Sequence, residues 1–237
     1  MKIAIMQPYL FPYLGYFSLI KHTDRFILLD TVQYIRHGWV DRNRILKPDK
    51  GWQYIKVPIR KHSRNSSIED VRISNDQNWK TRILGQLQHY KKIAPHFNQV
   101  IDLVEGIFYR EYNSIAQLNL ISLKSICNYL NLDPSVQFFS KMDLAIENPN
   151  APDEWALNIC KAIPGIDEYW NPIGGINLFD KKKYQASSIE LRFIEIKLPS
   201  YGQRREEVFE RGLSIIDVLM FNDPDSVNLM LDDFILT

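Results

Sequence analysis

A dense cluster of basic and aromatic residues is the strongest chemical signal in the sequence. Residues 34–64 contain nine Lys or Arg and two Asp, a charge of +7 in a chain whose formal net charge is +1. Arginine can give a phosphate two parallel hydrogen bonds, and a neighbouring aromatic ring can stack on a base or sugar. We therefore predict an anion site formed by Arg36, Trp39, Arg42, Asn43 and Arg44. A nucleic-acid surface and a solvated charged loop remain open as alternatives.

Residues that could move protons are few. Asp30 ends a predicted strand and His37 lies in the basic segment, so these two are the candidate proton acceptors. None of the five histidines has another His or a Cys three or four residues away, so no metal site is predicted. Cys127 and Cys160 fall in helical apolar patterns, which predicts packing roles. Two cysteines make no disulfide framework, and this fits a reducing cytoplasm.

Three turns that follow predicted strands could hold a ligand. The first runs from Gln7 to Tyr16 and leads into a predicted helix, whose free backbone N–H groups favour anions. The second contains adjacent glycines, which let a backbone approach a ligand closely, and the third is a polar turn after the last predicted parallel strand. Simple packing or turn formation is the alternative at each. The candidate ligand-binding residues in these turns are Gln7, Tyr13, Gly15, Tyr16, Gly174, Gly175 and Gln203.

The elements that must position these residues are those of an α/β fold. A strand over 2–6, a short helix over 15–21 and a strand over 25–30 have the spacing of a parallel βαβ unit. Further strands are predicted at 136–139, 169–171 and 191–198, and helices at 79–90, 114–130, 155–162, 214–220 and 225–234. The sequence therefore predicts one domain over 1–237, a Rossmann-like parallel sheet flanked by helices, with a basic insertion around 34–64. Active groups would gather at the carboxyl ends of the strands.

Two of the predicted helices carry a start signal of their own. Ser114 with Gln117, and Ser214 with Asp217, have the spacing of a capping box. For Asp217 this makes a structural role the stronger interpretation.

Composition excludes several classes of protein. The chain is 45% hydrophobic and nearly neutral, which excludes a disordered chain and a protein that is basic throughout. No apolar run approaches the roughly 18 residues that cross a bilayer, so no membrane insertion is expected. The length allows a sizeable hydrophobic core.

The opening segment is similar in layout to the nucleotidyltransferase and pantothenate-synthetase type of fold. In that fold a Pro-rich turn precedes a His-x-Gly-His signature, and the corresponding residues here are Tyr13-Leu14-Gly15-Tyr16. The resemblance implies activation of an acid with ATP. A neutral tyrosine can donate one hydrogen bond but supplies no positive charge, so the architecture carries over more readily than the catalytic groups.

A second resemblance rests on several segments taken in order: residues 6–17, Asp30 with 32–34, 39–45, 57–58, 170–175, Tyr201 with Gln203, and 213–219. Together these segments resemble the WbqC-like family of bacterial proteins, which are found with polysaccharide-biosynthesis genes. The resemblance implies a cytoplasmic role in the assembly of O-antigen or another surface glycan. The family's association with clusters that make acylated amino sugars suggests transfer of an aminoacyl group, such as glycyl, to a sugar amine.

Two hypotheses of different class follow. The first is an enzyme that forms an amide on a nucleotide-linked amino sugar or another phosphorylated small molecule. Its acyl group would be activated by ATP, or delivered by an acyl carrier or an aminoacyl-tRNA, and Asp30 or His37 would accept the proton of the attacking amine. The second is a non-catalytic protein that holds a glycan precursor or a partner enzyme, which the lack of a recognised nucleophile or metal motif favours.

Overall fold

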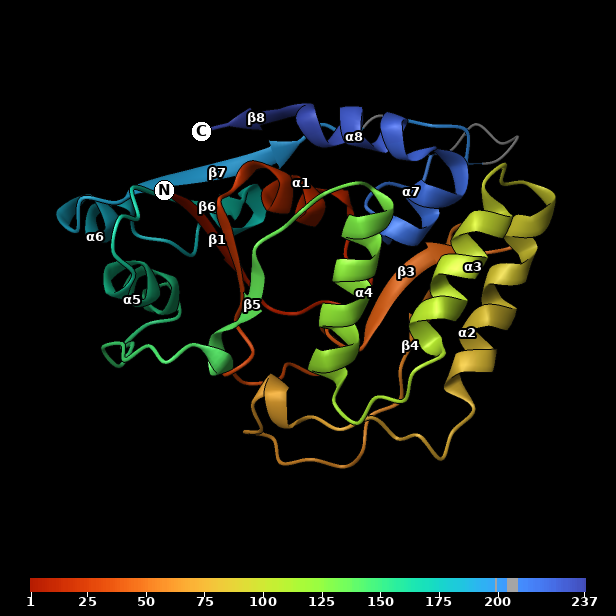
Figure 1. Cartoon of the computed structure of the whole chain (residues 1–237), viewed down its shortest axis with the longest axis horizontal. Helices are drawn as coiled ribbons and strands as arrows, with labels where there is room; N and C mark the ends of the chain where they lie inside the picture. Colours follow the sequence, from red (N-terminus) through yellow and green to blue (C-terminus); the bar gives the residue numbers. More distant parts are fainter. Residues whose placement is uncertain (199, 204–208) are drawn as a thin grey trace.

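A six-stranded sheet forms the centre of the fold in the computed structural model, which describes residues 1–198, 200–203 and 209–237 (Figure 1). The strand order is β5-β2-β1-β6-β7-β8, and all neighbours are parallel except β7 and β8. The strands are β1 (Lys2–Met6), β2 (Arg25–Leu28), β5 (Val136–Phe138), β6 (Glu168–Pro172), β7 (Glu190–Ile196) and β8 (Phe234–Leu236). The α/β class predicted from the sequence is confirmed.

The order of the strands reverses between β1 and β6. From β1 the chain continues to β2 and β5 on one side, and it later returns to β6 and β7 on the other side. In open parallel sheets, ligands bind in the crevice at the carboxyl ends of the strands where this reversal occurs. Gln7, directly after β1, and Asn171, near the end of β6, therefore lie at the place where a ligand is expected.

The two faces of the sheet are covered by different helices because successive strand residues point to opposite faces. One face packs against α1 (Leu14–His22) and α8 (Pro224–Asp232), and the other against α5 (Glu154–Ala162) and α6 (Lys181–Ala186). Burial of each large apolar side chain stabilises the fold by about 1.5–3 kcal/mol. The side chains toward α1 and α8 are Ala4, Phe26, Leu28, Trp170 and Ile194, and those toward α5 and α6 are Ile3, Ile5, Ile27, Tyr169, Leu191 and Phe193.

A group of helices lies beside a separate two-stranded sheet, at the end of the molecule away from α5 and α6 (Figure 1). The two-stranded sheet is an antiparallel hairpin of β3 (Arg42–Leu46) and β4 (Trp52–Lys56). The helices are α2 (Trp79–Leu87), α3 (Phe97–Phe108), α4 (Ile115–Tyr129) and α7 (Ile215–Phe221). Short 3₁₀ helices complete the chain: η1 (Ile68–Asp70), η2 (Gln88–Lys92), η3 (Phe139–Lys141) and η4 (Ile173–Gly175).

Several local predictions are corrected. The helix predicted over 225–234 ends at Asp232, because its last residues pair with β7 as β8. Ser114 precedes α4 but its side chain makes no capping hydrogen bond; its backbone pairs with Arg72 instead. Ser214 does cap α7, accepting from Ile216 N at 3.3 Å. Helices α3 and α6 and the β3–β4 hairpin were not predicted.

Across the described ranges, no helix has both the length and the apolar character that crossing a bilayer would require.

Candidate functional site

A cleft of about 1070 Å³ opens at the carboxyl ends of β1, β2 and β6, where the strand order reverses. This volume lies just above the usual range of about 300–1,000 Å³ for small-molecule sites. Its walls come from distant parts of the chain: the turn between β1 and α1, the basic segment, the residues before α5, and the turn after β6. Of the residues predicted to bind a ligand, the cleft brings together Gln7, Tyr13, Trp39, Asn43, Arg44, Gly174 and Gly175.

The turn between β1 and α1 is held in place by hydrogen bonds from buried side chains. The Tyr16 hydroxyl donates to Gln7 O at 2.7 Å, and Tyr16 is fully buried. Asn43 Nδ2 donates to Leu10 O and to Phe11 O, each at 2.9 Å. Phe11 has a φ of 42°, a conformation that non-glycine residues rarely adopt, so these bonds hold a bent backbone. Tyr16 and the amide of Asn43 therefore position the turn, and Asn43 reaches the edge of the cleft.

Tyr13 lies over the first turn of α1 and faces the cleft. A Cβ on Gly15 would come within 2.5 Å of the Tyr13 ring, so only glycine leaves room for this orientation. Burial, with a smaller contribution from neighbouring Tyr9, raises the pKa of Tyr13 to about 12. At neutral pH the Tyr13 hydroxyl is therefore protonated and can donate a hydrogen bond to a ligand.

Arg44 is the cation that the fold brings to the cleft. Its guanidinium carbon lies 5.4 Å from the ring centroid of Trp39 and 5.1 Å from that of Trp52, so the group sits between two indoles. Nη2 donates to Gly212 O at 3.0 Å, while the buried Nε has no hydrogen-bond partner. An unsatisfied buried N–H costs free energy, and a cation held rigidly in this way is suited to an anionic ligand.

Two other predicted phosphate-binding arginines lie outside the cleft lining. Arg36 is exposed. Arg42 donates from Nε to Gly38 O at 3.3 Å and from Nη2 to His37 O, and it lies 4.1 Å from the Tyr54 ring centroid. Arg42 thereby holds the loop that carries Trp39.

The two candidate proton acceptors also lie outside the cleft lining. Asp30 is 2% exposed, and its carboxylate accepts from Ser140 N at 3.0 Å and Ser140 Oγ at 2.6 Å. These bonds tie the end of β2 to η3. His37 is exposed with a φ of 64°, and its carbonyl is bound by Arg42.

The turn after β6 forms the opposite wall. Asn171 Nδ2 donates to the Tyr169 hydroxyl at 2.7 Å, and the Asn171 side chain is largely buried. A Cβ on Gly175 would come within 2.3 Å of Asn171 Oδ1, so glycine is required for this close approach. At Gly174 a Cβ would meet nothing within 4 Å.

A family model, described as the WbqC-like protein family, matches residues 7–229 of this chain. The chain belongs to the WbqC-like family. It is also 28% identical over 223 residues to a protein of Mycobacterium tuberculosis named "Uncharacterized protein Rv1507c", and the match covers 93% of each chain. No solved structure matches. The family predicted from the sequence is confirmed, whereas the likeness to the nucleotidyltransferase fold stays a prediction.

The segments that suggested this WbqC-like family meet in two places. The turn after β1, the residues around Trp39–Arg44 and the turn after β6 line the cleft. Gln203 lies in a second, buried group: Asp217 accepts from Tyr90 and Tyr201 hydroxyls at 2.6 and 2.7 Å and from Gln203 Nε2 at 3.0 Å. The Asp217 carboxylate therefore binds these three side chains and does not form the predicted capping box with Ser214. Gln203 joins the last turn to α7, outside the cleft lining.

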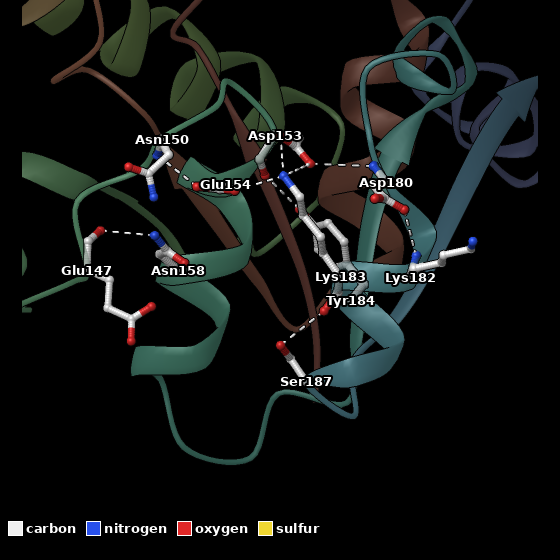
Figure 2. A network of polar contacts seen from close by, with 10 residues as sticks. All are labelled: Glu147, Asn150, Asp153, Glu154, Asn158, Asp180, Lys182, Lys183, Tyr184 and Ser187. Carbon is white, nitrogen blue, oxygen red and sulfur yellow. Dashed lines mark hydrogen bonds and ion pairs between the residues drawn. The ribbon is translucent and has the colours of Figure 1, made fainter.

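The wall in front of α5 was missed by the sequence analysis. Residues 149–152 line the cleft together with Trp155 and Ala156. Figure 2 shows the contacts behind this wall: Lys183 Nζ lies 3.3 Å from the Asp153 carboxylate and 2.8 Å from Glu154 Oε1, and Asn150 N donates to Glu154 Oε2 at 2.7 Å. The run of Pro and Asn in 148–152 was the available signal, but Lys183, the partner of the Asp153 and Glu154 that follow it, lies about thirty residues further along the chain.

The chemistry of the lining is narrow. Among the described lining residues, the ionisable side chains are Arg44 and the tyrosines Tyr9, Tyr13 and Tyr169, and burial raises the pKa of all three tyrosines. Burial also raises the pKa of both cysteines, to about 12 at Cys127, and both lie in hydrophobic clusters. No group of three His, Cys, Asp or Glu side chains that could hold a metal ion occurs in the described ranges. The described part of the lining thus offers the Arg44 cation, several neutral hydrogen-bond donors and aromatic surface.

Proposed function

We propose that this protein binds a nucleotide-linked amino sugar in the cleft and transfers an aminoacyl group, such as glycyl, to the sugar amine during assembly of a surface polysaccharide. The observation that carries the proposal is Arg44, whose guanidinium lines the cleft at the carboxyl ends of the strands and is held by Gly212 O and two neighbouring indoles. In this site a diphosphate is the ligand group that would pair with its charge.

The remainder of the lining fits the other parts of such a ligand. Exposed Trp39 offers a ring for stacking against a base or sugar. Gln7 and Gln33 line the cleft with amide groups that can bind sugar hydroxyls. The volume leaves room for an acyl group beside the sugar.

The proposed reaction needs no nucleophilic side chain. The sugar amine attacks the carbonyl carbon of an activated acyl donor, a C–N bond forms, and the bond to the donor's leaving oxygen or sulfur breaks. The amine proton goes to that leaving atom, so no further reactant is required. Holding the two substrates in contact would supply much of the rate, and in this proposal the protonated Tyr13 hydroxyl donates to the carbonyl oxygen as charge develops on it.

A non-catalytic role in holding a glycan precursor is the second candidate. The observation that favours it is the lining: none of its described residues carries a carboxylate, an imidazole or a thiol. Binding without turnover is the outcome that would establish this alternative.

Binding is tested by thermal shift and calorimetry with a nucleoside diphosphate-linked amino sugar. At 100 times its Kd the ligand should stabilise the protein by about 2.7 kcal/mol. Arg44→Ala should weaken binding by about 10- to 150-fold, since a charge-assisted hydrogen bond contributes roughly 1.5–3 kcal/mol. Arg44→Lys should fall in between, because lysine keeps the charge without the paired donors.

Arg36→Ala is the matched control, because Arg36 belongs to the same basic segment but lies outside the cleft lining. Equal losses in Arg36→Ala and Arg44→Ala would mean diffuse attraction and would contradict the assigned site. Mass spectrometry of the sugar incubated with an activated glycyl thioester then tests for the amide. Binding without any amide product would leave the non-catalytic role.

A further inference from the structure

One face of the β3–β4 hairpin combines cations with aromatic rings. Side chains of paired residues share one face of the hairpin, and the pairs Arg42–Lys56 and Arg44–Tyr54 lie opposite each other. Trp52 follows on the same face, two residues before Tyr54. The exposed Lys56 lies 3.7 Å from the buried Asp41 carboxylate, and Arg82 of α2 donates to the Lys56 carbonyl at 3.1 Å, which adds another positive charge at this end.

Each of the two arginines on this face lies near an aromatic ring. The Arg42 guanidinium lies 4.1 Å from the Tyr54 ring centroid, and the Arg44 guanidinium lies 5.4 Å from that of Trp39 and 5.1 Å from that of Trp52. Trp52 and Tyr54 are in edge contact, with ring centroids 4.9 Å apart. A groove of about 560 Å³ runs beside them, lined by Lys47, Gly51, Trp52, Gln53, Tyr54 and Glu210.

We propose that this face of the hairpin binds the unpaired end of an RNA strand. Bases of single strands stack on aromatic rings and on arginine planes, while lysine and arginine contact the phosphates between them. Charge complementarity favours such a polyanion, because the hairpin belongs to the segment of charge +7 in a nearly neutral chain. Paired RNA hides its base faces, so the unpaired end is the part that this surface recognises.

The hairpin lies beside the cleft, so the RNA could supply the acyl group. This role rests on the proposed aminoacyl transfer. Arg44 contacts Trp52 beside the groove and also lines the cleft, so the two sites adjoin at this residue. An RNA lying on the hairpin can therefore present an aminoacyl ester on its terminal ribose to the sugar amine. The C–N bond forms, the ester C–O bond breaks, and the amine proton goes to the ribose oxygen that is released. The acyl donor of the proposed transfer is then an aminoacyl-RNA.

Fluorescence anisotropy tests the binding, with a labelled stem–loop RNA that ends in four unpaired nucleotides and a blunt stem–loop as the control. The wild type should bind the first RNA more tightly than the second. Tyr54→Ala should weaken binding by about 5- to 150-fold, and Tyr54→Phe should keep the stacking and the affinity. Lys56→Gln should reduce the slope of log Kd against log salt by about 0.7 if Lys56 contacts one phosphate.

Lys182→Ala is the matched control, because Lys182 lies in the first turn of α6, at the other end of the molecule (Figure 1). Thermal shift with the nucleotide-linked sugar is measured on the same variants. The stabilisation by the sugar should be the same in Tyr54→Ala and Lys56→Gln as in the wild type.

If the wild type bound the sugar but did not bind the RNA, this inference would be overturned and the proposed function would stand. Equal binding of the blunt RNA, or equal effects of Lys182→Ala and Lys56→Gln, would also overturn it. Displacement of the RNA by anionic phospholipid vesicles at matched phosphate concentration would assign the face to a membrane surface instead.

Discussion

Arg44 differs from the other cations of the basic segment in its surroundings rather than in its type. Two indoles and the Gly212 carbonyl fix its guanidinium, whereas Arg36 is exposed and Arg42 is engaged with the backbone of the loop at His37 and Gly38. A held guanidinium loses less conformational freedom on binding a phosphate than a free one. Binding strength therefore depends on the few residues that fix each side chain.

Gly15 provides a prediction at this scale. Gly15→Ala should weaken binding of the nucleotide-linked sugar by about 2- to 10-fold, because the added methyl displaces the Tyr13 ring and its hydroxyl loses a hydrogen bond to the ligand. The melting temperature should not fall, since alanine is favoured over glycine in a helix by roughly 1 kcal/mol. Calorimetry and thermal melting measure the two effects.

Gly174→Ala is the control for this experiment. It adds the same methyl group to another cleft residue, where a Cβ meets nothing within 4 Å. Equal losses of affinity in both variants would show that crowding of the cleft, rather than the position of Tyr13, causes the effect.

At the scale of elements, α1 and α8 are joined by an ion pair that depends on pH. Asp232 at the end of α8 lies 2.8 Å from Lys21 Nζ and 3.0 Å from His22 Nε2, both in the last turn of α1. The hydrogen bond from Lys21, followed by the charges of Lys21 and His22, lowers the pKa of Asp232. A carboxyl group whose pKa is lower in the folded state than in the unfolded state stabilises the fold when the pH is above the unfolded pKa. This stabilisation is lost as the pH falls through the folded pKa.

Asp232→Asn should therefore lower the melting temperature at pH 7. The difference from the wild type should begin to shrink near pH 4, about the pKa of an unfolded Asp, and disappear at lower pH. Melting curves of the two proteins between pH 7 and pH 2 measure this. A difference that stayed constant over the whole range would contradict an electrostatic role for Asp232.

The contacts between α5 and α6 allow a second prediction at this scale. Lys183→Met should lower the melting temperature, because the nearly buried Asp153 carboxylate loses its ion pair. Sugar binding should also weaken, because Asp153 and Glu154 hold the wall at residues 149–152. Adding Asp153→Asn should recover part of the stability, since the unpaired charge is removed.

Lys182→Met is the control for this pair, because its side chain points away from the network in Figure 2. If Lys182→Met and Lys183→Met lowered the melting temperature equally, the loss would come from α6 itself rather than from the ion pair with Asp153.

At the scale of the whole molecule, the cleft is made by segments that meet only in the folded chain. Its walls come from residues near 9–13, 39–44, 149–156 and 171–179, on both sides of the point where the strand order reverses. A ligand that fills the cleft would contact all four at once, and it would then link elements that pack on opposite faces of the sheet.

Hydrogen exchange should show this linkage. Adding the nucleotide-linked sugar should slow exchange in all four segments together, while α3 (Phe97–Phe108), which contributes no lining residue, should exchange at an unchanged rate. Protection confined to 39–44 would mean that the ligand binds only the basic segment, and it would contradict the cleft as the site.

Much of the fold was determined by the sequence alone. Short β-branched runs such as 2–6, and the apolar spacing of 79–90 and 114–130, depend on contacts within a few residues, so the α/β class and most elements could be predicted. The family could be predicted as well, because its motifs are local strings of residues such as 6–17 and 170–175. The candidate cleft residues at the ends of β1 and β6 were predicted for the same reason.

The tertiary structure alone decided which candidates meet. Nine cations in one segment look alike in sequence, but only the packing of Trp39, Trp52 and Gly212 around Arg44 turns that cation toward the cleft. Asp30 and Gln203 were reasonable ligands by type, yet Ser140 lies 110 residues from Asp30 and Asp217 lies 14 residues from Gln203. Such partners are brought together by the hydrophobic packing of whole elements, and no local pattern specifies them.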